Sequence, residues 1–138
     1  MKSQKITITT LQENSFHVFI TVKINDVKCR LLVDTGASVS VIDKSFFEKK
    51  FNKKTKVIEV ETSSLHNTQM QSHLAKIKTM TLAGATLKNL EFAALDLSHV
   101  NDNYKKINVK KIQGILGSDI LYKQKMIIDY AKAILYFS

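Results

Sequence analysis

Hydrophobic and polar residues alternate along much of the chain, which is the period-two pattern of strands that bury one face. The clearest case covers residues 16–24, and a second run over 27–33 follows an Asn25-Asp26 turn. The same reasoning predicts further strands over 5–11, 56–62, 70–82, 87–97, 112–116, 126–130 and 133–137. So many short strands in one chain are typical of an all-β barrel or sandwich.

Two short helices are expected beside the strands. Asp43 can cap one that holds Phe46 and Phe47. Ser118 can cap the other, which is the clearer of the two and runs through about Tyr122. The fold class expected from the pattern is therefore all-β, with one clear short helix near the C-terminal end.

Polar segments and overall composition set the organisation of the chain. The stretch 98–106 is dominated by Ser, His, Asn, Asp and Lys, so it predicts a loop. The chain has no proline, only four glycines and no linker-like segment, so we expect residues 1–138 to form a single domain. No apolar run approaches the ~18 residues that a membrane helix needs, so we expect no membrane partner.

One string of residues carries recognisable chemistry. Asp34 follows the apolar run Leu31–Val33, and Thr35 and Gly36 come directly after it. A carboxylate at the end of a buried strand, next to a hydroxyl donor and a glycine that allows a sharp turn, is suited to acid–base work. A second string, Ile115-Leu116-Gly117, lies much further along the chain.

Together the two strings resemble the retropepsin-like aspartic proteases, the single-lobe family of retroviral proteases and their cellular and bacterial relatives. The resemblance extends over roughly residues 16–137, with a candidate flap hairpin between 56 and 82 and a helix after Gly117. It implies a closed acid-protease barrel with a short C-terminal helix. The implied activity is that of an aspartic endopeptidase acting on polypeptide substrates.

The resemblance also assigns roles to particular residues. Asp34 is expected to be catalytic, with Thr35 and Gly36 as its scaffold. Expected substrate-binding positions are Ala37 and Ser38 after the motif, and Leu65, His66 and Asn67 at the flap tip.

A single Asp-Thr-Gly string supplies only half of such a site. Hydrolysis without a metal needs a base that takes a proton from water and an acid that protonates the carbonyl oxygen. Two close carboxylates that share one proton perform both roles, as they do in the aspartic proteases. The second carboxylate must then come from another chain, so we expect a C2 homodimer in which two copies of Asp34 meet.

Some positions depart from the family pattern. Retroviral enzymes often carry an Asp four residues after the catalytic one and an Arg after the second glycine, and Ser38 and Ser118 stand at those places. Family flaps are usually rich in glycine, whereas residues 51–83 contain none. An alternative is therefore a non-proteolytic dimeric peptide-binding module on the same fold.

Charge and the content of histidine and cysteine bear on nucleic-acid binding, on metal binding and on the cellular location. The net charge is +9, but it comes from twenty lysines scattered along the chain and a single arginine, Arg30. Arginine is the usual residue for bidentate phosphate and base recognition, so we expect solvated lysines rather than a nucleic-acid site.

The four histidines lack the spacing of metal ligands, and we expect neither metal nor cofactor. Cys29 is the only cysteine, and it lies on the apolar face of its predicted strand. A single cysteine in a sequence with no export signal favours a cytoplasmic location.

Overall fold

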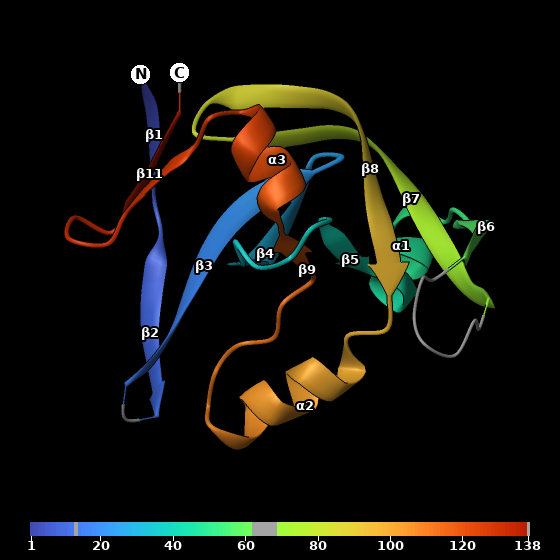
Figure 1. Ribbon diagram of the computed structural model, residues 1–138, viewed down its shortest axis with the longest axis horizontal. Helices are drawn as coiled ribbons and strands as arrows, with labels where there is room; N and C mark the ends of the chain where they lie inside the picture. The colour runs from blue at the N-terminus through green and yellow to red at the C-terminus, as the bar shows by residue number, and fades with distance from the viewer. Residues whose placement is uncertain (13, 62–68, 138) are drawn as a thin grey trace.

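The computed structural model describes the backbone of residues 1–12, 14–61 and 69–137, and the side chains of all of these except 56–61 and 69–72. Figure 1 shows the arrangement of its helices and strands. The strands are β1 (Lys2–Lys5), β2 (Thr7–Gln12), β3 (Ser15–Ile24), β4 (Val27–Val33), β5 (Val41–Asp43), β6 (Lys56–Glu61), β7 (Gln69–Leu82), β8 (Ala85–Leu95), β9 (Gly114–Leu116), β10 (Ile127–Asp129) and β11 (Ile134–Phe137). The helices are α1 (Lys44–Phe51), α2 (Ser98–Lys106) and α3 (Ser118–Lys123).

Six strands close into a barrel, which confirms the predicted fold class. The order is β3-β4-β9-β5-β8-β7, and β7 returns to β3 through the antiparallel pairs Lys23↔Thr81 and Ile24↔Met80. β2 and β6 extend the sheet at its two ends. The Asn25-Asp26 turn between β3 and β4 has positive φ at both residues, which suits a tight hairpin.

The terminal segments form a second, smaller sheet in the order β1-β11-β10. β1 pairs antiparallel with β11 of the same chain, from Lys2↔Phe137 to Lys5↔Ile134. The two chain ends therefore lie side by side (Figure 1). β11 is the central strand of this sheet, and β1 and β10 are its edges.

Two hydrophobic clusters fill the molecule. The larger occupies the barrel interior and includes Leu31, Ile42 and Phe92, all of which are fully buried. The smaller lies between the barrel wall and α2 and contains Phe19, Val41, Leu97, Tyr104 and Ile112. Burial of these side chains supplies most of the driving force for the fold.

Helix α2 is the main departure from the sequence-based prediction, which made residues 98–106 a loop. Leu97 and Tyr104 are buried and Val100 is partly buried, and their spacing places them on one face of the helix. Asn101 adds a second attachment, because its side chain donates to the Ile112 carbonyl (3.0 Å) and accepts from the Ile112 amide (2.8 Å). These few well-placed side chains therefore outweigh a predominantly polar composition.

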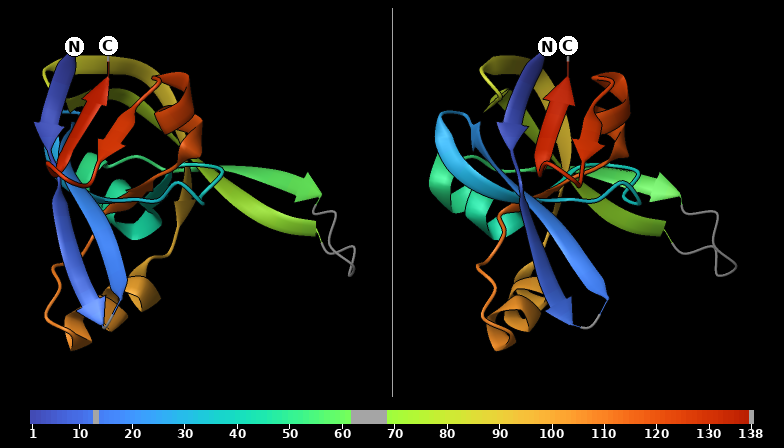
Figure 2. Two further views of the ribbon diagram at one scale, coloured as in Figure 1. Left: turned by 60° about the vertical axis from the view of Figure 1, so that its left-hand side comes forward. Right: turned by 90° about the vertical axis from the view of Figure 1, so that its left-hand side faces the viewer.

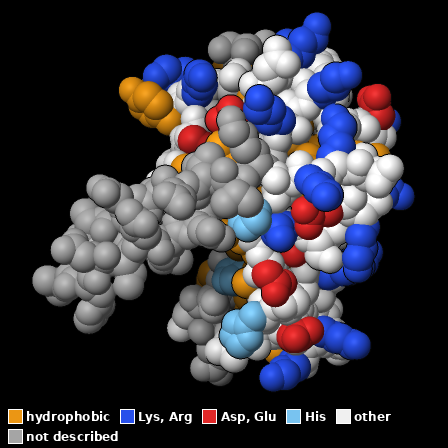
Figure 3. All heavy atoms as spheres, turned by 90° about the vertical axis from the view of Figure 1, so that its right-hand side faces the viewer, with side chains coloured by type: hydrophobic (Ala, Val, Ile, Leu, Met, Phe, Trp, Pro, Cys, Tyr) orange, Lys and Arg blue, Asp and Glu red, His pale blue; other side chains and the backbone are white. Residues whose placement is uncertain are grey.

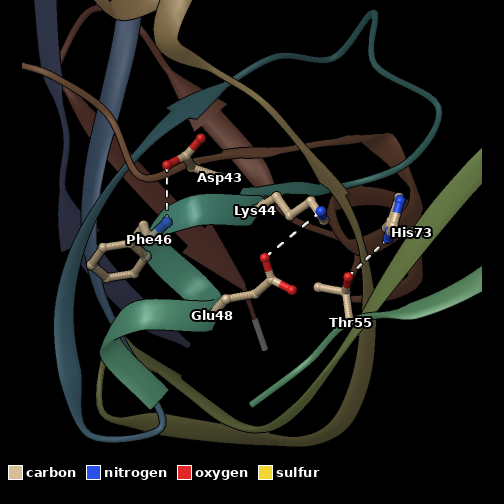
Figure 4. Close-up of polar contacts among 6 residues, drawn as sticks. All are labelled: Asp43, Lys44, Phe46, Glu48, Thr55 and His73. Carbon is tan, nitrogen blue, oxygen red and sulfur yellow. Dashed lines mark hydrogen bonds and ion pairs between the residues drawn. The ribbon is translucent and has the colours of Figure 1, made fainter. Parts of the chain in front are cut away.

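Helix α1 forms as the sequence predicts. One Asp43 carboxylate oxygen accepts from the Phe46 amide (3.1 Å) and caps the helix, while the other accepts from the Leu97 amide (2.9 Å). Lys44 and Glu48 form an ion pair on the exposed side of the helix (3.7 Å; Figure 4). Asp43 thus joins the start of α1 to the segment that precedes α2.

The candidate flap leaves the barrel as a two-stranded arm. β6 and the first part of β7 project beyond the barrel (Figure 2), paired antiparallel from Lys56↔Leu74 to Glu61↔Gln69. At the base of the arm, the Thr55 hydroxyl and His73 Nδ1 form a hydrogen bond (2.9 Å; Figure 4). The predicted tip residues Leu65, His66 and Asn67 lie outside the described residues.

Charged side chains are dispersed over the face shown in Figure 3, where acidic side chains lie between the basic ones. This agrees with lysines that are scattered along the sequence. No helix in the described part of the chain is both long and apolar enough to cross a membrane.

The attachment of α2 generates a first prediction. Asn101→Ala removes both hydrogen bonds to Ile112 and leaves two backbone groups without partners, which should lower the free energy of unfolding by about 1–3 kcal/mol. Urea denaturation followed by circular dichroism measures the change. Asn103→Ala is the matched control, because Asn103 is exposed on the same helix and should shift stability by no more than about 0.5 kcal/mol. Equal effects of the two substitutions would contradict this role of Asn101.

Candidate active site

Asp34 stands where two distant segments of the chain run side by side. β4 and β9 are parallel neighbours, with Leu32 opposite Ile115 and Val33 opposite Leu116. The Asp34 amide continues this pairing by donating to the Leu116 carbonyl (3.0 Å). The structure thus brings together the two strings that the sequence analysis singled out.

The residues after Asp34 form a tight turn around its carboxylate. The Gly36 amide donates to Asp34 Oδ1 (2.9 Å), and the Ala37 amide donates to the Asp34 carbonyl (3.1 Å). A Cβ atom at Gly36 would lie 3.2 Å from Asp34 Oδ1, so glycine leaves room for the carboxylate. The turn therefore holds the acid by backbone geometry.

Gly117 and Ser118, which follow β9, pack against this turn and support it. The Ser118 amide and hydroxyl both donate to the Ala37 carbonyl, at 2.7 and 3.0 Å. At Gly117, a Cβ atom would come within 2.8 Å of that carbonyl and 2.9 Å of the Val39 carbonyl, so only glycine allows the two loops to cross this closely. The prediction that Ser118 caps α3 is wrong, because Gly117 is the N-cap residue and the Ser118 side chain binds the loop instead.

Ser40 is a buried polar residue that the sequence analysis did not select as part of the site. Its hydroxyl accepts from the Gly117 amide (2.9 Å) and donates to Asp119 Oδ1 (2.7 Å). Asp119 Oδ2 accepts from the Ser40 amide (3.0 Å), and Oδ1 also accepts from the Ile120 amide. Asp119 therefore satisfies one backbone donor in the first turn of α3 and one in the loop before β5. The signal for Ser40 was a small hydroxyl residue between Val39 and Val41.

Asp34 is half-buried, whereas Thr35 and Gly36 are exposed. A pocket of about 270 Å³ lies beside them. Its lining residues are Phe16, His17, Val18, Leu32, Val33, Asp34, Thr35, Ile128 and Tyr130. Two of these apolar side chains are largely exposed, Phe16 at 56% and Tyr130 at 61%. The candidate acid therefore lies at the surface, next to apolar side chains that remain largely open to solvent.

A polar cluster includes residues of the strands that flank Asp34. His17 Nδ1 and the Tyr104 hydroxyl form a hydrogen bond (2.8 Å), and the Arg30 guanidinium lies 4.1 Å from the centre of the Phe19 ring. Burial raises the pKa of Tyr104, Arg30 acts to lower it, and Asp34 raises it further. Burial lowers the pKa of Arg30. The sequence carried no local signal for this cluster, because Tyr104 reaches it from α2.

The remaining predicted positions have different surroundings. Ala37 is half-buried and its carbonyl accepts from Ser118, while Ser38 is exposed.

The described residues hold no group of three His, Cys, Asp or Glu side chains placed to bind a metal ion. Burial raises the pKa of the Cys29 thiol to about 11, which suits the predicted role of a buried apolar residue.

The two serines of the loop provide a matched test of this architecture. Ser40→Ala should lower the free energy of unfolding by about 1–3 kcal/mol, because it leaves the Gly117 amide without its acceptor and removes the hydroxyl donor to Asp119 Oδ1. Ser38→Ala, in the same loop but exposed, should change stability by no more than about 0.5 kcal/mol. Denaturant unfolding of both variants measures the difference. A Ser40 variant as stable as the Ser38 variant would show that this network does not hold the loops together.

The chain is similar to known proteins in both sequence family and fold. The family model for aspartyl proteases matches residues 20–120. No curated protein matches the chain. A retropepsin-like aspartic protease from Rickettsia conorii is 21% identical, with a TM-score of 0.59 over 96% of this chain and 90% of that one.

Two further solved structures are similar. The retroviral protease-like domain of Ddi1 from Leishmania major is 18% identical, with a TM-score of 0.57 over 87% of this chain and 86% of that one. EIAV protease, solved in complex with an inhibitor, is 19% identical, with a TM-score of 0.51 over 83% of this chain and 93% of that one. At these identities the likeness shows the fold. Because the family model covers more than half of its length, the chain belongs to the aspartyl protease family, and its fold is retropepsin-like.

Proposed function

We propose that the chain is an aspartic endopeptidase that acts as a homodimer. The observation that carries this proposal is the place of Asp34 at the junction of β4 and β9, held by the Gly36 amide and open to solvent. Membership of the aspartyl protease family supports the same activity. Thr35 and Gly36 complete the motif around the carboxylate.

Two copies of Asp34 would divide the chemical work. Like charges about 3 Å apart cannot both ionise, so one carboxylate keeps a proton and the other does not. The ionised carboxylate takes a proton from water as that water attacks the peptide carbonyl, and the protonated one donates to the carbonyl oxygen. The resulting tetrahedral intermediate then collapses, with proton transfer to the leaving amine.

The need for a second chain follows from the count of motifs. Asp34-Thr35-Gly36 occurs once in the sequence, so one chain supplies one such carboxylate. Thr35 is exposed beside Asp34, where its hydroxyl can donate across a two-fold axis. A polypeptide substrate would lie extended over the paired acids and add main-chain hydrogen bonds as a strand does.

The alternative is a dimeric module that binds peptides without cleaving them. Ser38 and Ser118 replace the charged pair of many retroviral enzymes, and residues 51–83 contain no glycine. In the structure, Ser118 has a different role, because its hydroxyl donates to the Ala37 carbonyl. Peptide binding without cleavage by the wild-type chain would favour this alternative.

The first activity test replaces the acid itself. Asp34→Asn keeps the side-chain size and an oxygen that can accept from Gly36, but it removes the titratable proton from both copies at once. Cleavage of a fluorogenic peptide should fall by about 10³-fold or more. Thermal unfolding and sedimentation serve as controls for the fold and the dimer, both of which should be retained. Cleavage close to the wild-type rate would exclude Asp34 as the catalytic acid.

The second test uses enzyme concentration. When most chains are monomers, the concentration of dimer varies with the square of the total, so halving the enzyme should lower the rate by about fourfold. Initial rates across a dilution series, with sedimentation at the same concentrations, measure this dependence. A rate strictly proportional to enzyme in a monomeric sample would show that one chain holds a complete site.

A further inference from the structure

The register of β3 and β4 places His17 opposite the candidate acid. The last backbone pair that joins the two strands is Val18↔Val33, so the next positions along the antiparallel ladder are His17 and Asp34. Opposite residues of an antiparallel pair have their side chains on the same face of the sheet, with Cβ atoms about 4.5–5.5 Å apart. His17 and Asp34 line the same pocket, in agreement with this register. The His17 imidazole is therefore within reach of a group bound at the acid.

Tyr104 of α2 fixes the orientation of the His17 ring. The Tyr104 hydroxyl and His17 Nδ1 form a hydrogen bond (2.8 Å), and the two rings meet edge to face with their centroids 5.8 Å apart. Tyr104 is itself buried and packs edge to face against Phe19 at 5.6 Å. A side chain that is already held in one orientation loses little conformational freedom when a ligand binds. His17 is thus ordered before any substrate arrives.

The second ring nitrogen of His17 is open. In the part of the chain that the structure describes, His17 forms a hydrogen bond through Nδ1 alone, and the only buried side-chain nitrogen or oxygen without a partner is Arg30 Nε. His17 Nε2 is therefore reached by solvent. A phenol hydroxyl is a stronger donor than a neutral imidazole N–H, so Tyr104 donates to Nδ1 and the ring hydrogen is on Nε2. His17 thus presents an N–H donor.

The charge beside this donor favours an acceptor oxygen. Residues 30, 32 and 34 alternate onto one face of β4, and the Arg30 guanidinium on that face lies 4.1 Å from the centre of the Phe19 ring. Among the described residues, the ion pair Lys44–Glu48 is the only one, so Arg30 has no carboxylate partner. An ammonium group bound here would be repelled by Arg30, whereas an oxygen acceptor would be attracted to it.

We propose that His17 is a specificity-determining residue, and that its Nε2–H donates to a side-chain oxygen of the substrate residue next to the cleaved bond. The favoured substrates are polypeptides with a carboxamide or carboxylate side chain, glutamine or glutamate, at that position. In a two-fold symmetric site each copy of Asp34 has its own His17, so both residues that flank the cleaved bond are selected in this way. The inference rests on the proposed function and names the substrate class of that site.

The preference is tested with four fluorogenic peptides that differ only in the residues flanking the cleaved bond. These residues are glutamine, glutamate, norleucine or lysine. Norleucine has the length of glutamine without a polar atom, and lysine can only donate. The glutamine or the glutamate peptide should show kcat/KM about 10-fold above that of the norleucine peptide, because the apolar side chain leaves the His17 donor unpaired, and the lysine peptide should be cleaved most slowly. Equal values, or the highest value for norleucine or lysine, would overturn the proposal.

Three variants assign the preference to His17. His17→Phe keeps a ring against Tyr104 but has no donor, so its kcat/KM for the glutamine and norleucine peptides should be equal. His17→Gln restores an amide donor and should recover part of the preference, which a purely structural role would not require. His99→Phe is the matched control, because His99 is exposed on α2, and it should leave the ratio unchanged. Each ratio is measured within one variant, so a smaller folded fraction does not alter it. A full preference in His17→Phe would overturn the proposal.

The specificity and the proposed activity can fail separately. Fluorescence anisotropy measures the binding of the same peptides to the Asp34→Asn chain, with and without His17→Phe. If the wild-type chain cleaves no peptide, but His17→Phe removes a binding preference for glutamine or glutamate over norleucine, the inference stands and the peptidase function fails. If cleavage requires Asp34 but is indifferent to the flanking side chains, the function stands and the inference is wrong. Peptides that are neither bound nor cleaved would overturn both.

Discussion

The close crossing of two loops is the contact on which the rest of the site depends. The turn after Asp34 rests on the chain at Gly117 and Ser118, and the Ala37 carbonyl receives two hydrogen bonds there. A side chain at Gly117 would collide with two backbone carbonyls, so the crossing requires glycine on one side and a bare backbone on the other. The buried Ser40 and its partner Asp119 fix the loops from behind.

This arrangement explains why so little of the candidate site consists of long side chains. A backbone amide holds the Asp34 carboxylate, and a backbone carbonyl receives the support from Ser118. Main-chain groups lose little conformational freedom when they bind, because the barrel strands already order them. The barrel thus positions a half-buried carboxylate without enclosing it, and one face of the acid stays available to another molecule.

Sequence reasoning succeeded where the signal was local. Alternating apolar residues predicted β3 and β4, and Asp43 predicted the start of α1. It failed where a distant contact decided the outcome. Residues 98–106 are mostly polar and form a helix because Tyr104 reaches a cluster on the barrel wall. Serine is a common N-cap residue, but the Ser118 hydroxyl donates to the Ala37 carbonyl instead. No pattern within the segment around Ser118 indicates that distant partner.

The parallel pairing of β4 with β9 has a consequence for how the chain acquires its structure. Strands joined by about eighty intervening residues contribute high contact order, and such contacts form late in folding because loop-closure entropy must be overcome first. During synthesis from the N-terminus, the segment that carries Asp34 emerges well before residues 114–119. The Asp34 turn therefore lacks its supporting loop until residues 114–119 have been synthesised, so the nascent chain cannot order the candidate site before then.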